Sequence, residues 1–286
     1  MDTIITYLPF HRLHEVLDYF IKNAELINVK HKVVYIDNIF TERQLDLLRR
    51  AIPEDVEIRH GNWRDRNLTF VRIFRDAKEE NWDALVVDSD NILDKKLIKF
   101  DRELVSRFGF YTVMDYAGIK GPKAKGWWDR SIKLGSIKVD DEEIEVYGFK
   151  IFNLWKTVFF IGPKQAVRLS RSLLESLNYS MLEKVEESLR DIDARVRSCL
   201  TDETVLGLLL FYSNIRVTPW VIMSHHMHHG STETKDLRTL KLLTATVHAQ
   251  LGRRLLKKGL DKRILWYYIR YKTAQLYNFL VEYVKE

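Results

Sequence analysis

The sequence is poor in cysteine and has no long apolar run. Its 286 residues contain a single cysteine, Cys199, which excludes an internal disulfide framework and a cysteine-rich zinc site. No segment approaches the roughly 18 uninterrupted apolar residues of a membrane-spanning helix. The first six residues also lack the basic and then apolar character of a signal peptide. These absences favour a cytoplasmic protein.

Excess positive charge is absent from most of the chain, although the whole sequence carries a net charge of +6. Residues 235–286 hold 12 Lys+Arg and 4 Asp+Glu, a net charge of +8, so residues 1–234 carry 6 − 8 = −2. We therefore predict a main domain over residues 1–234 and a basic, aromatic-rich helical extension over residues 235–286. Basic and aromatic residues together suit a peripheral contact with the inner face of a membrane or an anionic lipid-linked acceptor. Homodimerisation or packing on the main domain is the alternative.

The first half of the sequence alternates between short apolar runs and stretches in which apolar residues recur at helical spacing. This β-α-β-α-β-α-β order predicts an α/β fold, with a mostly parallel sheet flanked by helices and followed by the helical extension. The predicted strands are Ile4–Leu8, Val33–Ile36, Val56–Arg59 and Ala84–Val87, and the predicted helices between them are His11–Lys22, Thr41–Ala51 and Asp65–Glu80.

The second half of the sequence is less regular. The pattern there predicts a loop over Gly118–Gly135, a helix from Pro163 to about Leu177, an amphipathic helix over Ser180–Leu200, a helix that opens at Thr201 and a histidine-rich loop over residues 224–232.

Polar residues follow three of the predicted strands. In parallel sheets ligands bind outside the carboxyl ends of the strands, so we expect the segments that begin at Pro9, Asp37 and Asp88 to lie on one edge and face one cleft. In extended backbone, residues two apart point the same way, so Asp88 and Asp90 could reach one site. Two carboxylates suit a hard divalent cation such as Mg²⁺ or Mn²⁺, which bridges a diphosphate and neutralises its charge. A polar turn that caps the next helix is the alternative.

These segments resemble the motifs of the GT-A glycosyltransferases over roughly residues 3–220. Leu8-Pro9-Phe10-His11-Arg12 looks like the family's first-strand turn, and Val86-Val87-Asp88-Ser89-Asp90 matches its metal-binding Asp-X-Asp. The resemblance implies a nucleotide-diphosphate sugar as donor and Mn²⁺ or Mg²⁺ as cofactor. It places Pro9, Asp37, Arg64, Arg66, Asn67, Asp88 and Ser89 around the donor, with Asp37 at the nucleobase and Arg64 or Arg66 at the diphosphate.

Thr201-Asp202-Glu203 is similar to the family's second acidic motif, which supplies the catalytic base in inverting members. A carboxylate there would take the proton from the acceptor hydroxyl. The structural alternative is that Asp202 and Glu203 are first-turn acids favoured by the helix dipole. A late histidine completes the metal site in several GT-A enzymes, and that role falls here to His228 or His229. Such a histidine favours Mn²⁺ but is more typical of retaining members, whereas the acidic motif favours inversion.

Two further features allow a functional and a structural interpretation. Trp127 and Trp128 could stack on the donor sugar within a closing loop, or one of them could pack in the core. The histidine-rich loop could instead bind phosphate or simply be exposed.

The sequence therefore predicts a metal-dependent glycosyltransferase that acts on the hydroxyl of a glycan, lipid-linked or small-molecule acceptor. A sugar nucleotidyltransferase is the nearest enzyme alternative, but it usually carries an N-terminal glycine-rich loop, and residues 3–12 contain no glycine. Nucleic-acid binding through the basic extension is a different class, which the net charge of −2 over residues 1–234 disfavours. A GT-A-like scaffold without activity is the remaining alternative.

Overall fold

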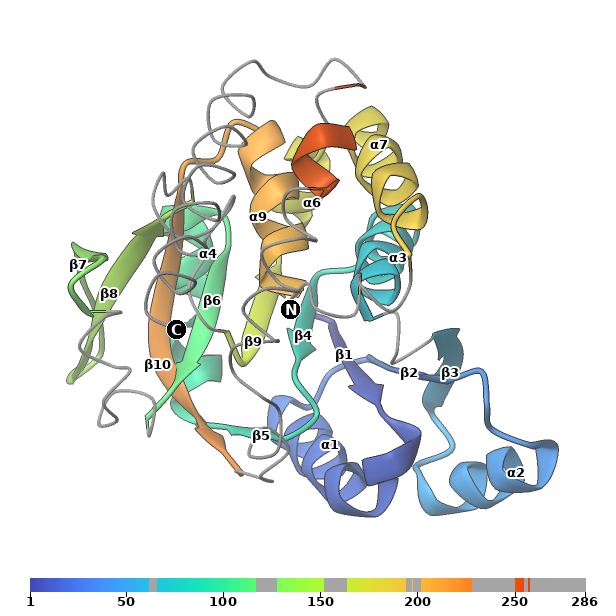
Figure 1. The fold of residues 1–286 in the computed structure, drawn as a ribbon. Helices are drawn as coiled ribbons and strands as arrows, with labels where there is room; N and C mark the ends of the chain where they lie inside the picture. Colours follow the sequence, from blue (N-terminus) through green and yellow to red (C-terminus); the bar gives the residue numbers. More distant parts are fainter. Residues whose placement is uncertain are drawn as a thin grey trace, which may run out of the picture.

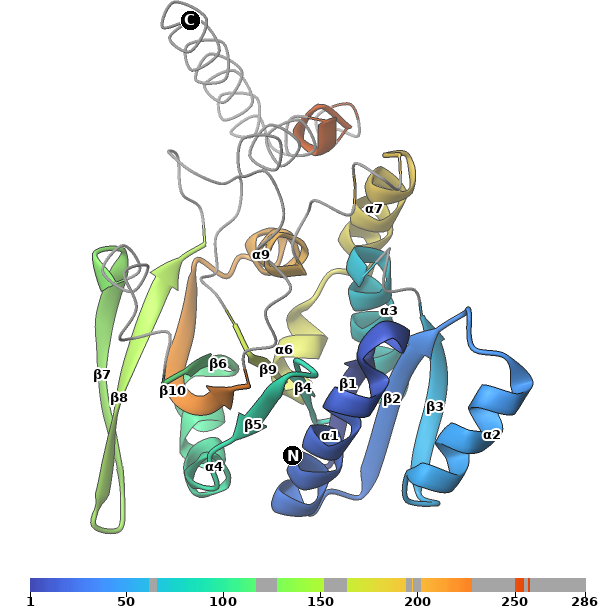
Figure 2. The same ribbon diagram turned by 60° about the horizontal axis from the view of Figure 1, so that its bottom comes forward.

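The computed structural model describes residues 1–61, 66–116, 128–151, 164–193, 197, 202–227, 250–254 and 257, apart from the side chains of His11, His14 and Arg66. Within these ranges the chain forms one sheet with helices on both faces (Figures 1 and 2). The predicted α/β class, with a mostly parallel sheet flanked by helices, is confirmed. No described helix is long and apolar enough to cross a membrane.

The sheet has ten strands, and nine of them follow the order β3-β2-β1-β4-β9-β6-β10-β8-β7, with β5 paired to β10. β3, β2, β1 and β4 are parallel, as are β6 and β10, whereas β9 runs antiparallel between β4 and β6. The strands are β1 Thr3–Leu8, β2 His31–Asp37, β3 Val56–Gly61, β4 Ala84–Val87, β5 Asn91–Leu93, β6 Tyr111–Asp115, β7 Ser131–Val139, β8 Glu142–Lys150, β9 Ala166–Leu169 and β10 Val217–His226.

Two hydrophobic cores lie on opposite faces of this sheet. One face is covered by α1, α2 and α4, and the other by α3, α6, α7 and α9. The strands β1 and β4 are almost wholly buried, because helices cover both of their faces. The helices are η1 Phe10–Arg12, α1 Leu13–Ile27, α2 Glu42–Ala51, α3 Arg66–Glu79, α4 Lys96–Phe108, α6 Arg171–Ser176, α7 Tyr179–Arg190 and α9 Asp202–Tyr212.

The strands and helices predicted up to Val87 are present in the structure, and one of these helices begins with a cap. Thr41 is the N-cap of α2, and a capping box joins its side chain to Gln44. The division into a main domain and an extension stays a prediction, because residues 235–249 and most of residues 250–286 lie outside the described ranges. Residues 250–254 and 257 are helical.

The second half departs from its predicted elements in four places. β7 already begins at Ser131, inside the predicted loop. The predicted helix from Pro163 is instead strand β9 followed by α6, because Ala166–Leu169 is buried in mid-sheet and Ser170 caps the helix after it. The amphipathic helix α7 ends at Arg190. The histidine-rich segment is strand as far as His226 rather than loop.

Candidate active site at the carboxyl edge of the sheet

The loops after β2, β1 and β4 lie side by side, because these three strands are parallel neighbours. The backbone N–H of Phe10, after β1, donates to the Asp37 carboxylate at the end of β2 at 3.0 Å. The Arg12 guanidinium lies 3.5 Å from the carboxylate of Asp90, after β4. The predicted meeting of these three segments on one edge is therefore confirmed.

Asp37 is buried and supports the turn that begins at Pro9. Besides the N–H of Phe10, its carboxylate accepts a hydrogen bond from the Tyr7 hydroxyl. Burial, followed by this bond to Asp37, raises the pKa of Tyr7 far above its ordinary value, so the hydroxyl keeps its proton. The side chain predicted to contact a nucleobase thus also fixes the first-strand turn.

Asp88-Ser89-Asp90 forms a turn, in which the Asn91 N–H donates to the Asp88 carbonyl at 3.2 Å. The expectation of extended backbone is wrong here, because β4 ends at Val87 and β5 begins three residues after Asp88. The turn gives the two carboxylates separate partners: Asp88 contacts Lys164, whereas Asp90 contacts Arg12 and His226.

A lysine that the sequence did not single out lies between Asp88 and the start of α9. The Lys164 ammonium is 3.2 Å from Asp88 and 2.7 Å from Asp202, and 5.1 Å from the centre of the Phe70 ring. Its side chain is 1% exposed. Burial lowers the pKa of Lys164, but the Asp202 and Asp88 carboxylates raise it more, and the result lies above the ordinary value. The ammonium is therefore a permanent buried cation. The only signal in the sequence was a lysine just before a short apolar run.

Asp202 and Glu203 occupy the first turn of α9, where the helix dipole favours acids. Burial, and then the neighbouring Asp202 carboxylate, raises the pKa of Glu203. Burial also raises the pKa of Asp88, and Asp202 and Asp90 add to that effect against Lys164. The two acidic segments that the sequence predicted therefore share one electrostatic environment.

Asp90 lies in a second group of charged side chains beside the first. The His226 imidazole Nε2 is 3.2 Å from the Asp90 carboxylate, and this contact raises the pKa of His226. The backbone N–H of His226 donates to Asp115 at 3.2 Å. His225 instead stacks on Tyr116, with ring centroids 4.9 Å apart. His226 therefore contacts Asp90, whereas the predicted metal ligands His228 and His229 lie outside the described residues.

The carboxylates of Asp88 and Asp90 and the imidazole of His226 are ligand types that an ion such as Mn²⁺ accepts. Across the described ranges, no three His, Cys, Asp or Glu side chains converge closely enough to enclose a metal ion. A nucleotide site does not need such an enclosure, because Mg²⁺-type ions take one or two carboxylates and complete their shell with phosphates and water. Asp88 suits this role, because its side chain is 37% exposed and only one of its oxygens contacts Lys164.

The remaining predicted residues lie further from this corner or outside the described ranges. Asn67 is fully buried, and its amide donates to the backbone carbonyl of Arg197 at 3.2 Å, so it joins α3 to the segment before α9. Trp128 packs against Tyr147 and Trp220, which is the packing role expected of one of the two tryptophans. Arg64, Trp127, His228, His229 and the side chain of Arg66 lie outside what the structure describes.

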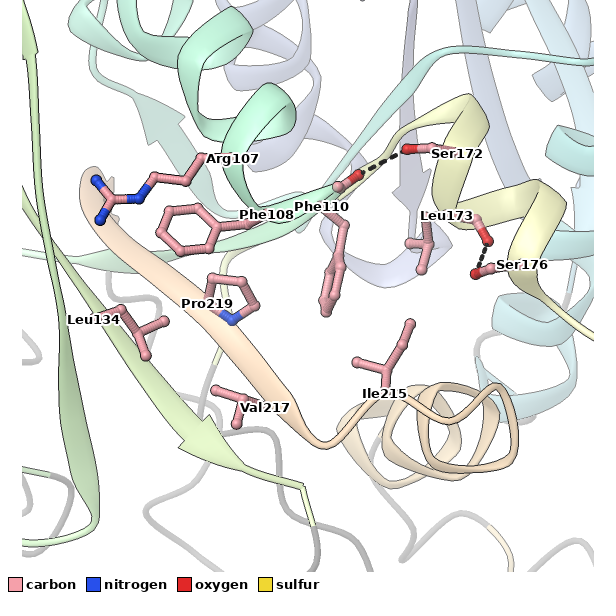
Figure 3. A pocket seen from close by; sticks show the side chains of 11 residues that line it. Arg107, Phe108, Phe110, Leu134, Ser172, Leu173, Ser176, Ile215, Val217 and Pro219 are labelled. Atoms are coloured by element: carbon pink, nitrogen blue, oxygen red, sulfur yellow. Dashed lines mark hydrogen bonds between the residues drawn. The ribbon is translucent and has the colours of Figure 1, made fainter.

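A cleft of about 440 Å³ lies at the opposite edge of the sheet (Figure 3). Phe110 and Val217, at the amino ends of β6 and β10, line it together with Leu173 and Ile215. Its serines are already hydrogen-bonded to the backbone: Ser172 to Gly109 and Ser176 to Leu173. The cleft is thus mainly apolar and contains none of the predicted site residues.

No protein-family model and no curated protein sequence matches the chain. Among solved structures, the chain is similar to S. aureus TarS, residues 1–349, with 10% identity, 96% of this chain and 72% of that chain covered, and a TM-score of 0.44. It is also similar to HddC from Yersinia pseudotuberculosis (11% identity, 63% and 81% covered, TM-score 0.33). A third likeness is to a 4-diphosphocytidyl-2C-methyl-D-erythritol synthase (14% identity, 85% and 100% covered, TM-score 0.36). With TM-scores below 0.5, these likenesses say nothing about substrate or reaction.

Proposed function

We propose that this protein is a metal-dependent glycosyltransferase, which moves a sugar from a nucleotide-diphosphate donor to an acceptor hydroxyl. One observation carries the proposal: Asp88, from the end of β4, and Asp202, from the start of α9, meet on the buried ammonium of Lys164. This contact joins the residues of the two acidic motifs, 114 positions apart in sequence (202 − 88).

The charge balance of this corner favours a divalent cation as a cofactor. Four carboxyl groups, those of Asp88, Asp90, Asp202 and Glu203, lie beside two permanent cations, Lys164 and Arg12, and the imidazole of His226. When these acids are ionised they outnumber the cations, and an anionic diphosphate would be repelled, because like charges a few ångströms apart interact strongly near a protein surface. Mn²⁺ or Mg²⁺ held by Asp88 and Asp90, with His226 beside them, would reverse the local charge and stabilise the departing diphosphate.

The donor would lie along the edge formed by the loops after β2, β1 and β4. Its nucleobase would contact the turn at Pro9 and the side chain of Asp37, and Ser89 would lie beside its diphosphate. Arg64 or Arg66, at the start of α3, would contact the diphosphate from the other side. A ligand placed this way follows the general position of ligands on parallel sheets.

The acceptor would be deprotonated by a carboxylate at the start of α9. The proton of the acceptor hydroxyl would pass to the carboxylate as the oxygen attacks the anomeric carbon, and the bond from that carbon to the diphosphate would break. The ammonium 2.7 Å from Asp202 weakens that carboxylate as a base. Burial raises the pKa of Glu203, so Glu203 is the better base of the two. Such a base implies inversion at the anomeric carbon.

The proposal is tested by incubating the full chain with a panel of nucleotide-diphosphate sugars, with and without Mn²⁺, and measuring release of the nucleoside diphosphate. Asp88→Asn and Asp90→Asn are each expected to lower the metal-dependent rate by about 10²–10³-fold, the effect of losing one electrostatic contact to a developing charge. Asp140→Asn is the matched control, because Asp140 is 77% exposed in the turn between β7 and β8. Full metal-dependent activity in both site variants would refute the site.

A further inference from the structure

Lys164 is a cation inside the proposed site that a ligand cannot reach directly. Its side chain is 1% exposed and lies against Asp88, Asp202 and the ring of Phe70. The ammonium therefore acts on a bound metal or substrate through its charge and through the two carboxylates that it holds, and not by direct contact. Its two ion pairs join the end of β4 to the start of α9.

We propose that Lys164 is a positioning residue that keeps the metal site weak until the nucleotide diphosphate arrives. It holds one oxygen of Asp88 and its positive charge opposes a second cation there, while it fixes Asp202 at a set distance from Asp88. This inference rests on the proposed function, in which Asp88 binds the metal.

The electrostatic reason is direct. A unit charge beside Asp88 repels a divalent ion bound to the other side of the same carboxylate, and at such short range the repulsion changes affinity by about tenfold or more even at high effective dielectric. The diphosphate supplies the negative charge that offsets this repulsion. Metal and nucleotide are therefore expected to bind together and leave together, which favours release of the nucleoside diphosphate after transfer.

Two variants separate this role from a merely structural one, because they change metal affinity in opposite directions. Lys164→Met removes the competing cation and keeps an unbranched side chain against Phe70, so Mn²⁺ should bind at least about tenfold more tightly. Asp202→Asn removes one of the two anions that share the ammonium, so Lys164 should hold Asp88 more strongly and Mn²⁺ should bind more weakly. Structural damage would weaken Mn²⁺ binding in both variants.

Lys99→Met is the matched control. The Lys99 ammonium also lies between two carboxylates, 3.2 Å from Asp140 and 3.3 Å from Glu142, but at the surface and away from the proposed site. This variant should leave Mn²⁺ affinity unchanged.

The experiment is a titration of the full chain with Mn²⁺, followed by electron paramagnetic resonance of the free ion, with and without a nucleoside diphosphate. We expect weak binding to the wild type that the diphosphate strengthens, tighter binding to Lys164→Met without the diphosphate, and weaker binding to Asp202→Asn. Unchanged or weaker binding to a folded Lys164→Met protein would overturn the inference.

The double variant Lys164→Met/Asp202→Asn keeps the test valid if Lys164→Met alone does not fold, because it removes both partners of the ion pair. It should bind Mn²⁺ more tightly than Asp202→Asn does, and equal or weaker binding would again overturn the inference. If Asp88→Asn abolishes Mn²⁺ binding and Lys164→Met leaves the Mn²⁺ affinity unchanged, the proposed role of Lys164 is wrong. The proposed function is not affected by that outcome. If Asp88→Asn binds Mn²⁺ as tightly as the wild type does, Asp88 is not a metal ligand and the proposed metal site is wrong.

Discussion

An aspartate contacts a buried cation at each end of strand β4. The carboxylates are fully paired with cations at the amino end of the strand but not at the carboxyl end. Asp83 precedes the strand and Asp88 follows it, and each contacts a buried cation from β9 or the residues just before it, Arg168 and Lys164. At the amino end, two nitrogens of the Arg168 guanidinium contact Asp83, at 3.0 and 2.8 Å, and Asp101 lies 2.7 Å from a third. At the carboxyl end, one ammonium contacts two carboxylates, and Asp88 is 37% exposed.

The electrostatics of the two ends differ accordingly. Burial raises the pKa of Asp83, but Arg168 and the N-terminal ammonium of Met1 lower it more, and the result lies well below the ordinary 3.8. The pKa of Asp88 is raised instead, because protein atoms surround it although part of its side chain is exposed, and because other carboxylates lie around it. A fully paired buried charge stabilises the fold, whereas carboxylates in excess of their cations leave room for another cation. We therefore assign a stabilising role to the ion pairs at the amino end of β4 and propose the metal site at its carboxyl end.

The largest effect on stability is expected from Arg168→Met. Removing this guanidinium takes the buried cation away from Asp101 and leaves Asp83 with the Met1 ammonium at 2.7 Å. Breaking a buried ion pair in this way typically costs about 3–5 kcal/mol of the free energy of unfolding. Chemical denaturation would measure the loss, and the rate of transfer per folded molecule should stay unchanged. A loss below about 1 kcal/mol would show that the amino end is not the structural site that we describe.

A reciprocal pair of variants tests whether the two ends have separate roles. Asp88→Asn should lower metal-dependent transfer by about 10²–10³-fold and change stability little, because Asp88 is partly exposed. Asp83→Asn should lower stability and leave the rate per folded molecule intact. Steady-state kinetics and denaturation of both proteins would be compared, and similar profiles for the two variants would remove the distinction.

The pH dependence of stability should report on the amino end. Because the pKa of Asp83 is depressed in the folded chain, its contribution is present above its ordinary value of 3.8 and is lost as the pH falls below about 4. Denaturation at a series of acidic pH values should therefore show a smaller loss of stability in Asp83→Asn than in the wild type. An identical slope in the two proteins would contradict the depressed pKa.

The smallest effect is expected at a third cation between two carboxylates, Lys99. Its ammonium contacts Asp140 and Glu142, but it is 31% exposed and its partners are more so. Water and salt screen exposed ion pairs, which therefore contribute little to stability, so the denaturation midpoint of Lys99→Met should stay close to that of the wild type. A loss as large as that of Arg168→Met would mean that burial does not distinguish these three cations.

The sequence predicted the parallel half of the fold well, because apolar runs such as Ala84–Val87 alternate there with helices of regular spacing. It missed β9, because four buried residues without local turn signals look the same in a strand as in a helix. It also placed Asp88 and Asp90 on extended backbone, where the chain turns.

The site could be predicted only in part, for a physical reason. Asp88 and Asp202 were recognisable because Asp88 follows a strand, Asp202 begins a helix, and each belongs to a short acidic motif. Lys164 was not, because its role depends on the antiparallel pairing of β9 with β4. Likewise, His226 contacts Asp90 because strand β10 extends as far as His226. The cluster of histidines in the sequence did not indicate a strand there.

The most direct test of the central claim is a crystal structure of the protein with Mn²⁺ and a nucleoside diphosphate, in which the metal is located by its anomalous scattering. We predict a manganese peak at Asp88 and Asp90, bridged to the diphosphate, with the nucleobase against Pro9 and Asp37. A manganese peak elsewhere, or a nucleotide bound away from the carboxyl ends of β1, β2 and β4, would contradict the account.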